Sequence, residues 1–96
     1  MNMEVKQKDD SLKGMFYMEQ NNEVVAEMTY VWAGTSQIVI DHTEVNERLK
    51  GQGAGKLLLS KAVEFARNRG VKILPLCPFA KSVFSKEPEY RDVLHG

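Results

Sequence analysis

A glycine-rich segment in the middle of the chain has the residue types and spacing of a phosphate-binding loop. Its glycines stand at alternate positions, so no side chains keep a ligand away from the backbone there. A helical pattern begins near Leu57, and the first amide groups of that helix and the positive end of its dipole would point at the loop. This arrangement predicts an anion site. The loop residues are Lys50, Gly51, Gln52, Gly53, Ala54, Gly55 and Lys56.

Two better-known phosphate loops do not fit this segment. The Walker pattern requires a glycine and a hydroxyl at the positions where this chain has Lys50 and Leu57. The dinucleotide-binding fingerprint requires its third glycine one residue later than Gly55. The structural alternative is a tight strand-to-helix turn that binds nothing. Each glycine lowers the stability of the folded turn through its conformational entropy, and turn geometry alone does not require three of them.

A histidine and a carboxylate precede the loop on one predicted strand. Strand alternation puts His42 and Glu44 on the same face as Ile38 and Ile40, so the two polar side chains lie side by side. The other face is then formed by Val39, Asp41, Thr43 and Val45. Either His42 or Glu44 could act as a general base, directly or through a water. The structural alternative is a packed histidine and a solvated or ion-paired carboxylate.

The single cysteine, Cys77, is a candidate nucleophile. It ends an apolar strand and stands directly before Pro78 and a predicted helix, and a helix N-terminus favours the nucleophilic form of a thiol. The alternative is a small buried core thiol. One cysteine excludes an intramolecular disulfide, so we expect a reducing, cytoplasmic setting.

The first half of the chain must supply the strand that leads into the loop. Residues 13–20 and 24–32 are rich in β-forming side chains and are separated by Asn21-Asn22, which predicts a hairpin. Residues 37–45 form the next strand, and residues 5–9 are an edge strand or a frayed arm. The expected arrangement is an antiparallel meander.

After the loop the apolar period changes to that of a helix, which ends at Arg69 before Gly70. Residues 71–76 then form a strand that lies parallel to residues 37–45 through a right-handed crossover. Pro75 cannot donate to the ladder, so the two parallel strands should separate near it. The fold class is therefore α/β (α+β).

Two short helical segments complete the predicted chain. Residues 79–86 have an apolar side and stop before Pro88, and residues 89–94 form one more helical turn. His95 is expected to lie in a loose terminus.

The size and the net charge of the chain limit the classes of function that it can have. At 96 residues we expect one small domain, 1–96, with the composition of a folded soluble protein. A formal net charge of +0 argues against a nucleic-acid binder driven by bulk charge. No apolar run is long enough for a membrane span, the N-terminus lacks the apolar core of a signal peptide, and no metal site is expected.

The order of strand, basic residue, Gly-x-Gly-x-Gly, helix and second parallel strand resembles the GNAT acetyltransferases. Their pattern is Arg or Gln, two residues, Gly, one residue, then Gly or Ala, and here Lys50 takes the first position. The segments 42–45, 49–55, 75–80 and 87–90 look like those of the short Yjdj-type GNAT-like group. The resemblance covers roughly residues 16 to 94, and it implies a minimal GNAT-like fold without the N-terminal helical pair and C-terminal strands of fuller GNAT enzymes.

The resemblance implies a donor and the residues that hold it. The loop amides would bind the pyrophosphate of acetyl-coenzyme A, and Lys50 would keep the charge of arginine but not its bidentate fork. The backbone of Thr43, Glu44 and Val45 would pair with the pantetheine arm, and the Val45 N–H would polarise the acetyl carbonyl. Phe79, Ala80 and Cys77 would flank the arm.

The acceptor implied is an unidentified amine, on a small molecule or a protein. His42 or Glu44 would deprotonate it near the thioester, or Cys77 would first take the acetyl group and then pass it on. The alternative function is a non-enzymatic module that binds acetyl-coenzyme A or carries an acetyl group on Cys77. The chain is expected to be a monomer or a weak dimer.

Overall fold

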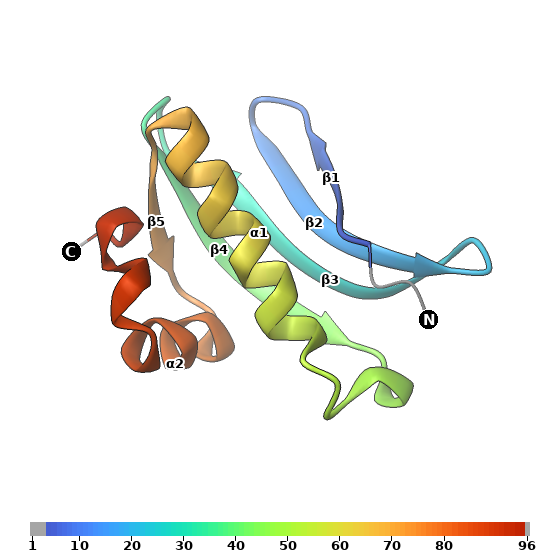
Figure 1. Cartoon of the computed structure of the whole chain (residues 1–96). Helices are drawn as coiled ribbons and strands as arrows, with labels where there is room; N and C mark the ends of the chain where they lie inside the picture. The colour runs from blue at the N-terminus through green and yellow to red at the C-terminus, as the bar shows by residue number, and fades with distance from the viewer. Residues whose placement is uncertain (1–3, 96) are drawn as a thin grey trace.

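The computed structural model describes residues 4–95. Five strands form one sheet in the order β1-β2-β3-β4-β5, and a long helix lies across it (Figure 1). The strands are β1 (Lys6–Asp9), β2 (Lys13–Gln20), β3 (Glu23–Trp32), β4 (Gln37–Val45) and β5 (Lys72–Pro75). The helices are α1 (Ala54–Arg69) and α2 (Pro78–Lys86), with the 3₁₀ helices η1 (Glu47–Leu49) and η2 (Pro88–Val93).

The topology confirms the predicted α+β arrangement. Strands β1 to β4 pair antiparallel in sequence order, and β5 pairs parallel with β4 after the chain has crossed over through α1. The predicted hairpin turn is present between Gln20 and Glu23, which face each other across the two strands. Asn21 and Asn22 both have positive φ, 53° and 66°, as the two-residue turns that match strand twist require.

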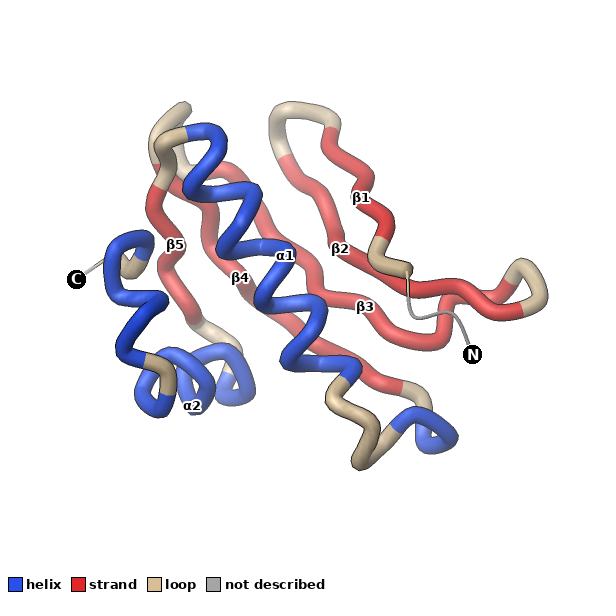
Figure 2. Tube along the Cα trace, viewed as in Figure 1, coloured by secondary structure: helices blue, strands red, loops and turns tan. Residues whose placement is uncertain are grey.

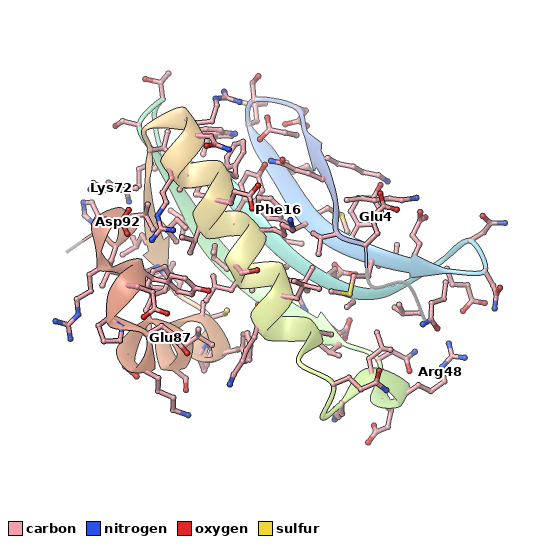
Figure 3. The ribbon with its side chains drawn as sticks, in the orientation of Figure 1. Glu4, Phe16, Arg48, Lys72, Glu87 and Asp92 are labelled. Atoms are coloured by element: carbon pink, nitrogen blue, oxygen red, sulfur yellow. The ribbon has the colours of Figure 1, made fainter. Side chains whose placement is uncertain are left out.

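One face of the sheet carries the core. In Figure 2, α1 runs diagonally over the strands, and in Figure 3 Phe16 lies close to this helix. The helix buries one side completely, with residues spaced three and four apart. Its buried side chains beyond the first turn are Leu58, Leu59, Ala62, Val63 and Ala66. Both α-helices of the described region pack on this face, which we call the covered face, and the other is the open face.

A β-bulge in β4 changes the face on which its later residues lie. Thr29 faces His42 on β4, whereas the next residue, Tyr30, faces Ile40, so Asp41 is an extra residue without a partner of its own. A bulge of this kind interrupts the alternation of side chains along a strand. The Asp41 carboxylate accepts a hydrogen bond from the Thr29 hydroxyl at 2.6 Å, which holds the extra residue in place.

The predicted face of His42 and Glu44 is therefore wrong. Thr43 is paired with the fully buried Met28, and Val45 packs against the core, so these two residues share the covered face with the isoleucines before the bulge. His42 and Glu44 are exposed and lie on the open face. The prediction counted alternate side chains onward from Ile40, and such a count cannot detect an extra residue that moves His42 and Glu44 to the other face of the sheet.

The C-terminal segment closes the outer edge of β5. The predicted turn at 89–94 is a 3₁₀ helix, and Arg67 fastens it to α1 through the Asp92 carboxylate at 2.8 Å and the Glu89 carbonyl at 2.6 Å. Lys72 also donates to the Asp92 carbonyl, and the two residues lie together in Figure 3. The expectation of a loose His95 is wrong, because its N–H donates to the Ile73 carbonyl at 2.8 Å.

The first hairpin is tied to the sheet by a hydrogen-bonded carboxylate, Asp9. Burial opposes its ionisation, but hydrogen bonds from the Tyr30 hydroxyl, the Ser11 N–H and the Trp32 ring N–H hold the Asp9 pKa below its ordinary value. Loss of water around the Tyr30 hydroxyl, with Asp9 beside it, raises the Tyr30 pKa. Asp9 is therefore charged, and Tyr30 is neutral, across the physiological range.

We expect this carboxylate to make folding stability depend on pH. A folded-state pKa below the unfolded value of 3.8 gives stability that is complete above that value and is lost as pH falls through the folded pKa. Urea unfolding from about pH 6 down to about pH 3 should show a smaller loss of unfolding free energy in Asp9→Asn than in the unsubstituted chain. Equal pH dependence in the two proteins would contradict the assignment.

Candidate functional site

The glycine loop turns the chain directly into α1. Gly51 and Gly53 have φ of 82° and 78°, a left-handed conformation that residues with side chains rarely adopt. The helix starts at Ala54, earlier than the predicted start near Leu57, and Gly53 caps it without a side-chain hydrogen bond. The Leu57 N–H makes the first helical bond, to the Gly53 carbonyl at 2.9 Å.

The first turn of α1 leaves backbone donors free. The N–H groups of Ala54, Gly55 and Lys56 precede the first helical bond, and no group within residues 4–95 accepts from them. They lie at a groove of about 450 Å³ that the loop lines together with Val45, Leu49 and Phe79. Three donors at the positive end of a sixteen-residue helix form a site for an anion.

Basic side chains add positive charge at the rim of this groove. Lys50 and Lys56 both line it. The Lys50 ammonium is 3.7 Å from the Glu47 carboxylate, but both side chains are well exposed, so the pair is weak and leaves Lys50 free to move. Gln52 makes local contacts instead, since its side-chain amide donates to the Arg48 carbonyl at 3.0 Å.

Gly55 has a packing role that the sequence did not indicate. A Cβ atom at this position would lie 2.7 Å from Cζ of Phe79, so the aromatic ring rests directly on the glycine. Phe79 keeps 36% of its surface exposed and forms one wall of the groove. The contact joins the first turns of α1 and α2, and only the fold brings these two positions together.

The parallel strands separate beside the loop, as predicted from Pro75. Their pairing ends at Ile40 opposite Pro75, and the Ile40 carbonyl then accepts from both the Leu76 N–H at 2.9 Å and the Cys77 N–H at 3.2 Å. Strand β4 continues to Val45, so its last residues have no neighbouring strand on that side. We call this opening the β4–β5 gap.

The backbone of two β4 residues points into the β4–β5 gap. The Asn46 N–H donates to Val25 of β3 at 2.7 Å, so by alternation Glu44 also directs its backbone groups towards β3. Thr43 and Val45 then direct theirs the other way, where β5 no longer runs. Their N–H and C=O groups are thus available to a ligand that enters the gap.

Cys77 stands at the inner end of the gap. It is the N-cap of α2, and its sulfur accepts from the Ala80 N–H at 3.4 Å. The Thr43 hydroxyl lies 3.2 Å from the same sulfur. Cys77 is only 6% exposed and Ala80 is fully buried, so the thiol contributes both to packing and to the start of the helix.

The structure thus gathers most of the predicted residues around one groove and gap. The loop, Val45 and Phe79 line the groove, and Thr43 and Cys77 are in contact at the inner end of the β4–β5 gap. His42 and the Glu44 side chain lie on the other side of β4, on the open face. A depression of about 490 Å³ on the sheet, lined among others by Lys8, Lys13 and Asp41, shares no residue with the loop groove.

Residues 4–95 offer neither a metal centre nor a membrane-crossing helix. No group of three or more His, Cys, Asp or Glu side chains in this range could hold a metal ion. None of the helices within the same residues has the length and hydropathy needed to cross a membrane.

Comparison with known proteins identifies the family. The family model of the GCN5-related N-acetyltransferases matches residues 15–93, which contain the loop, α1, β5 and Cys77. The chain belongs to this family. Its members use acetyl-coenzyme A as the acetyl donor, and the groove described above fits the pyrophosphate of that donor because it presents free amides and lysines at a helix N-terminus.

Solved structures of other proteins share the fold. A GCN5-like protein from Staphylococcus aureus, solved by NMR in solution, is 43% identical, with 99% of this chain and 90% of that chain covered and a TM-score of 0.76. A ribosomal-protein-alanine N-acetyltransferase from Brucella melitensis is 17% identical, with 80% and 62% covered and a TM-score of 0.62.

A third structure, a GNAT family acetyltransferase from Elizabethkingia anophelis, has acetyl-CoA bound. It is 18% identical, with 77% of this chain and 51% of that chain covered and a TM-score of 0.60, and at this identity the likeness concerns the fold. No functionally curated protein matches the chain significantly.

Proposed function

We propose that this member of the family binds acetyl-coenzyme A in the loop groove and transfers its acetyl group to an amine. The observation that carries the proposal is the set of free N–H groups at Ala54, Gly55 and Lys56, placed beside the β4–β5 gap. A diphosphate at the helix N-terminus would accept hydrogen bonds from the free N–H groups of α1, and an extended arm in the gap would pair with the free backbone groups of β4.

Each end of the donor has proposed partners. The loop amides with Lys50 and Lys56 hold the pyrophosphate, and Phe79 and the first turn of α2 flank the arm. The backbone of Thr43 and Val45 pairs with the amides of the arm, as strands pair. The Val45 N–H is the proposed donor to the acetyl carbonyl, where negative charge develops during transfer. Glu44 directs its backbone groups towards β3 and not into the gap, so its proposed contribution to acetyl transfer comes from its side chain.

The open face is the proposed side from which the amine arrives. His42 and Glu44 are exposed there, and β4 alone separates them from the gap. In direct transfer, one of them removes the proton of the ammonium, the amine nitrogen attacks the carbonyl carbon, and the carbon–sulfur bond of the thioester breaks. Coenzyme A then leaves and takes up a proton.

A covalent route through Cys77 is the finer alternative within the same function. The Cys77 thiol loses its proton and its sulfur attacks the carbonyl carbon, while the bond to the sulfur of coenzyme A breaks and that sulfur takes up a proton. The neutral amine then attacks the carbonyl carbon of acetylated Cys77, the bond to the Cys77 sulfur breaks, and a proton from the amine restores the thiol. The observation that favours this route is the position of Cys77 at the inner end of the gap, at a helix N-cap.

A second candidate function is an acetyl-coenzyme A-binding or acetyl-carrying module without turnover. The burial of Cys77 favours it over the covalent route, because a 6% exposed thiol is a poor group for handing an acetyl group to an external amine. The two functions predict the same binding but different kinetics. An amine that accelerates release of free coenzyme A supports the enzyme, whereas a stable acetyl adduct that no amine discharges supports the carrier.

The test begins with calorimetric titration of acetyl-coenzyme A, using dephospho-coenzyme A and free acetate as comparison ligands. Intact mass then reports any acetyl adduct, and a thiol-release assay over a panel of small amines and peptides reports turnover. We expect saturable binding and amine-dependent release. Absence of binding at about millimolar donor, corresponding to less than about 4 kcal/mol, would overturn both candidate functions.

A further inference from the structure

The sulfur of Cys77 has a polar neighbour from the opposite side of the β4–β5 gap. The Thr43 hydroxyl oxygen lies 3.2 Å from it, in a partly buried setting, although the two residues are 34 positions apart in the chain. A second group, the Ala80 N–H, approaches the same sulfur at 3.4 Å. A sulfur atom with a hydroxyl and an amide directed at it is held in one orientation.

The bulge at Asp41 creates this contact. In an unbulged strand, His42 would follow Ile40 on the covered face and Thr43 would point to the open face. The extra residue instead places the short hydroxyl side chain of Thr43 against α2 and leaves the imidazole outside. Because threonine is branched at Cβ and stiff at χ1, its hydroxyl stays where the strand directs it.

We infer that Thr43 is a positioning residue for the Cys77 sulfur. With the thiol protonated, the sulfur donates to the Thr43 oxygen or accepts from it, and with the sulfur ionised, the hydroxyl donates to it together with the Ala80 N–H. The two groups approach the sulfur from β4 and from α2, so together they fix the direction in which it points. This role of the hydroxyl is separate from the backbone groups of Thr43 in the gap.

The consequence for acetyl transfer rests on the proposed function. If acetyl-coenzyme A enters the gap, the Thr43 hydroxyl fixes the direction from which the sulfur meets the thioester. On the covalent route, removing the hydroxyl should then slow acetylation of Cys77 at saturating donor. Donor binding and the orientation of the sulfur are measured independently, so a failure of one is distinguishable from a failure of the other.

The test compares Thr43→Val, which keeps the shape, with Thr43→Ser, which keeps the hydroxyl. Cys77 is the only cysteine, so NMR three-bond couplings of labelled cysteine in the chain without ligand report the χ1 rotamer populations of this one side chain. We expect the parent and Thr43→Ser to keep one rotamer, and Thr43→Val to populate a second rotamer because the contact across the gap is lost.

The outcome is decided by the rotamer populations and not by activity. Equal populations in the parent, Thr43→Val and Thr43→Ser would overturn the inference, even if all three bind acetyl-coenzyme A. Amide spectra of each variant show whether the fold is kept. Thr43→Ala removes the same hydroxyl with a smaller side chain and gives the deciding comparison if valine disturbs the strand.

Discussion

Replacing Gly53 with valine is expected to lower the affinity for acetyl-coenzyme A by at least about a hundredfold, because several charge-assisted hydrogen bonds depend on the loop. Gly53 has φ of 78°, and a branched residue avoids this conformation, so the turn must change before it can enter α1. The amides of Ala54, Gly55 and Lys56 would then no longer converge on the groove. The new side chain would also occupy space that Gly53 now leaves open beside the ligand.

The chain offers a matched control in Gly34. This glycine lies in the turn between β3 and β4 and has φ of 71°, and a Cβ atom added there would meet nothing within 4 Å, as at Gly53. Gly34→Val therefore imposes the same backbone strain, about 1–2 kcal/mol, outside the groove. Calorimetric titration should show donor affinity retained in Gly34→Val and lost in Gly53→Val. Equal affinities in both variants would mean that the donor binds elsewhere.

The loop could be predicted from sequence because its chemistry is local. Glycine spacing, flanking lysines and the start of a helical period all lie within a few residues, and free amides at a helix start follow from helix geometry alone. The helix begins at Ala54, before the expected start near Leu57, since Gly53 serves as a cap without any side-chain hydrogen bond. The contact of Phe79 with Gly55 is not local, and no spacing within either segment indicates it.

The face assignment of β4 shows where sequence reasoning failed and why. The pattern from Ile38 to Val45 gives no sign of an extra residue, because Asp41 is as polar as an ordinary exposed strand position. The bulge is defined only by the register against β3, where Tyr30 faces Ile40 and Thr29 faces His42. One inserted residue puts Thr43 on the covered face beside Cys77 and leaves His42 and Glu44 on the open face.

The C-terminal segment is a second case in which the local structure could be predicted from sequence and its packing partners could not. A further helical turn after Pro88 was predictable from proline and the residues that follow it. Its place beside β5 was not, because it depends on Arg67 of α1 reaching Asp92 and on the His95 N–H reaching Ile73. These partners are far apart in the chain and carry no spacing signal.

The second large effect is expected at Cys77, where serine and alanine separate its two roles. The Cys77 sulfur caps α2 by accepting from the Ala80 N–H, and serine is a good capping residue whereas alanine is not. Cys77→Ser should therefore keep the unfolding free energy close to the parent, and Cys77→Ala should lose about 1 kcal/mol. Urea unfolding of the three proteins measures this structural role without any ligand.

The chemical role of Cys77 is then tested with the serine variant, which we expect to keep the fold. If the covalent route operates, Cys77→Ser should show no acetyl adduct in intact mass measurements, whereas the parent should show one. The variant should also release coenzyme A in response to amines more than about a hundredfold more slowly than the parent, while its donor affinity is retained. If the amine attacks the donor directly, release should stay within about threefold of the parent, and Glu44→Gln or His42→Gln should reduce it instead. The bulge puts Cys77 and the pair His42 and Glu44 on opposite faces of β4. If only the Cys77 variant loses amine-dependent release, the chemistry takes place on the covered face. If only the His42 or Glu44 variant loses it, the chemistry takes place on the open face.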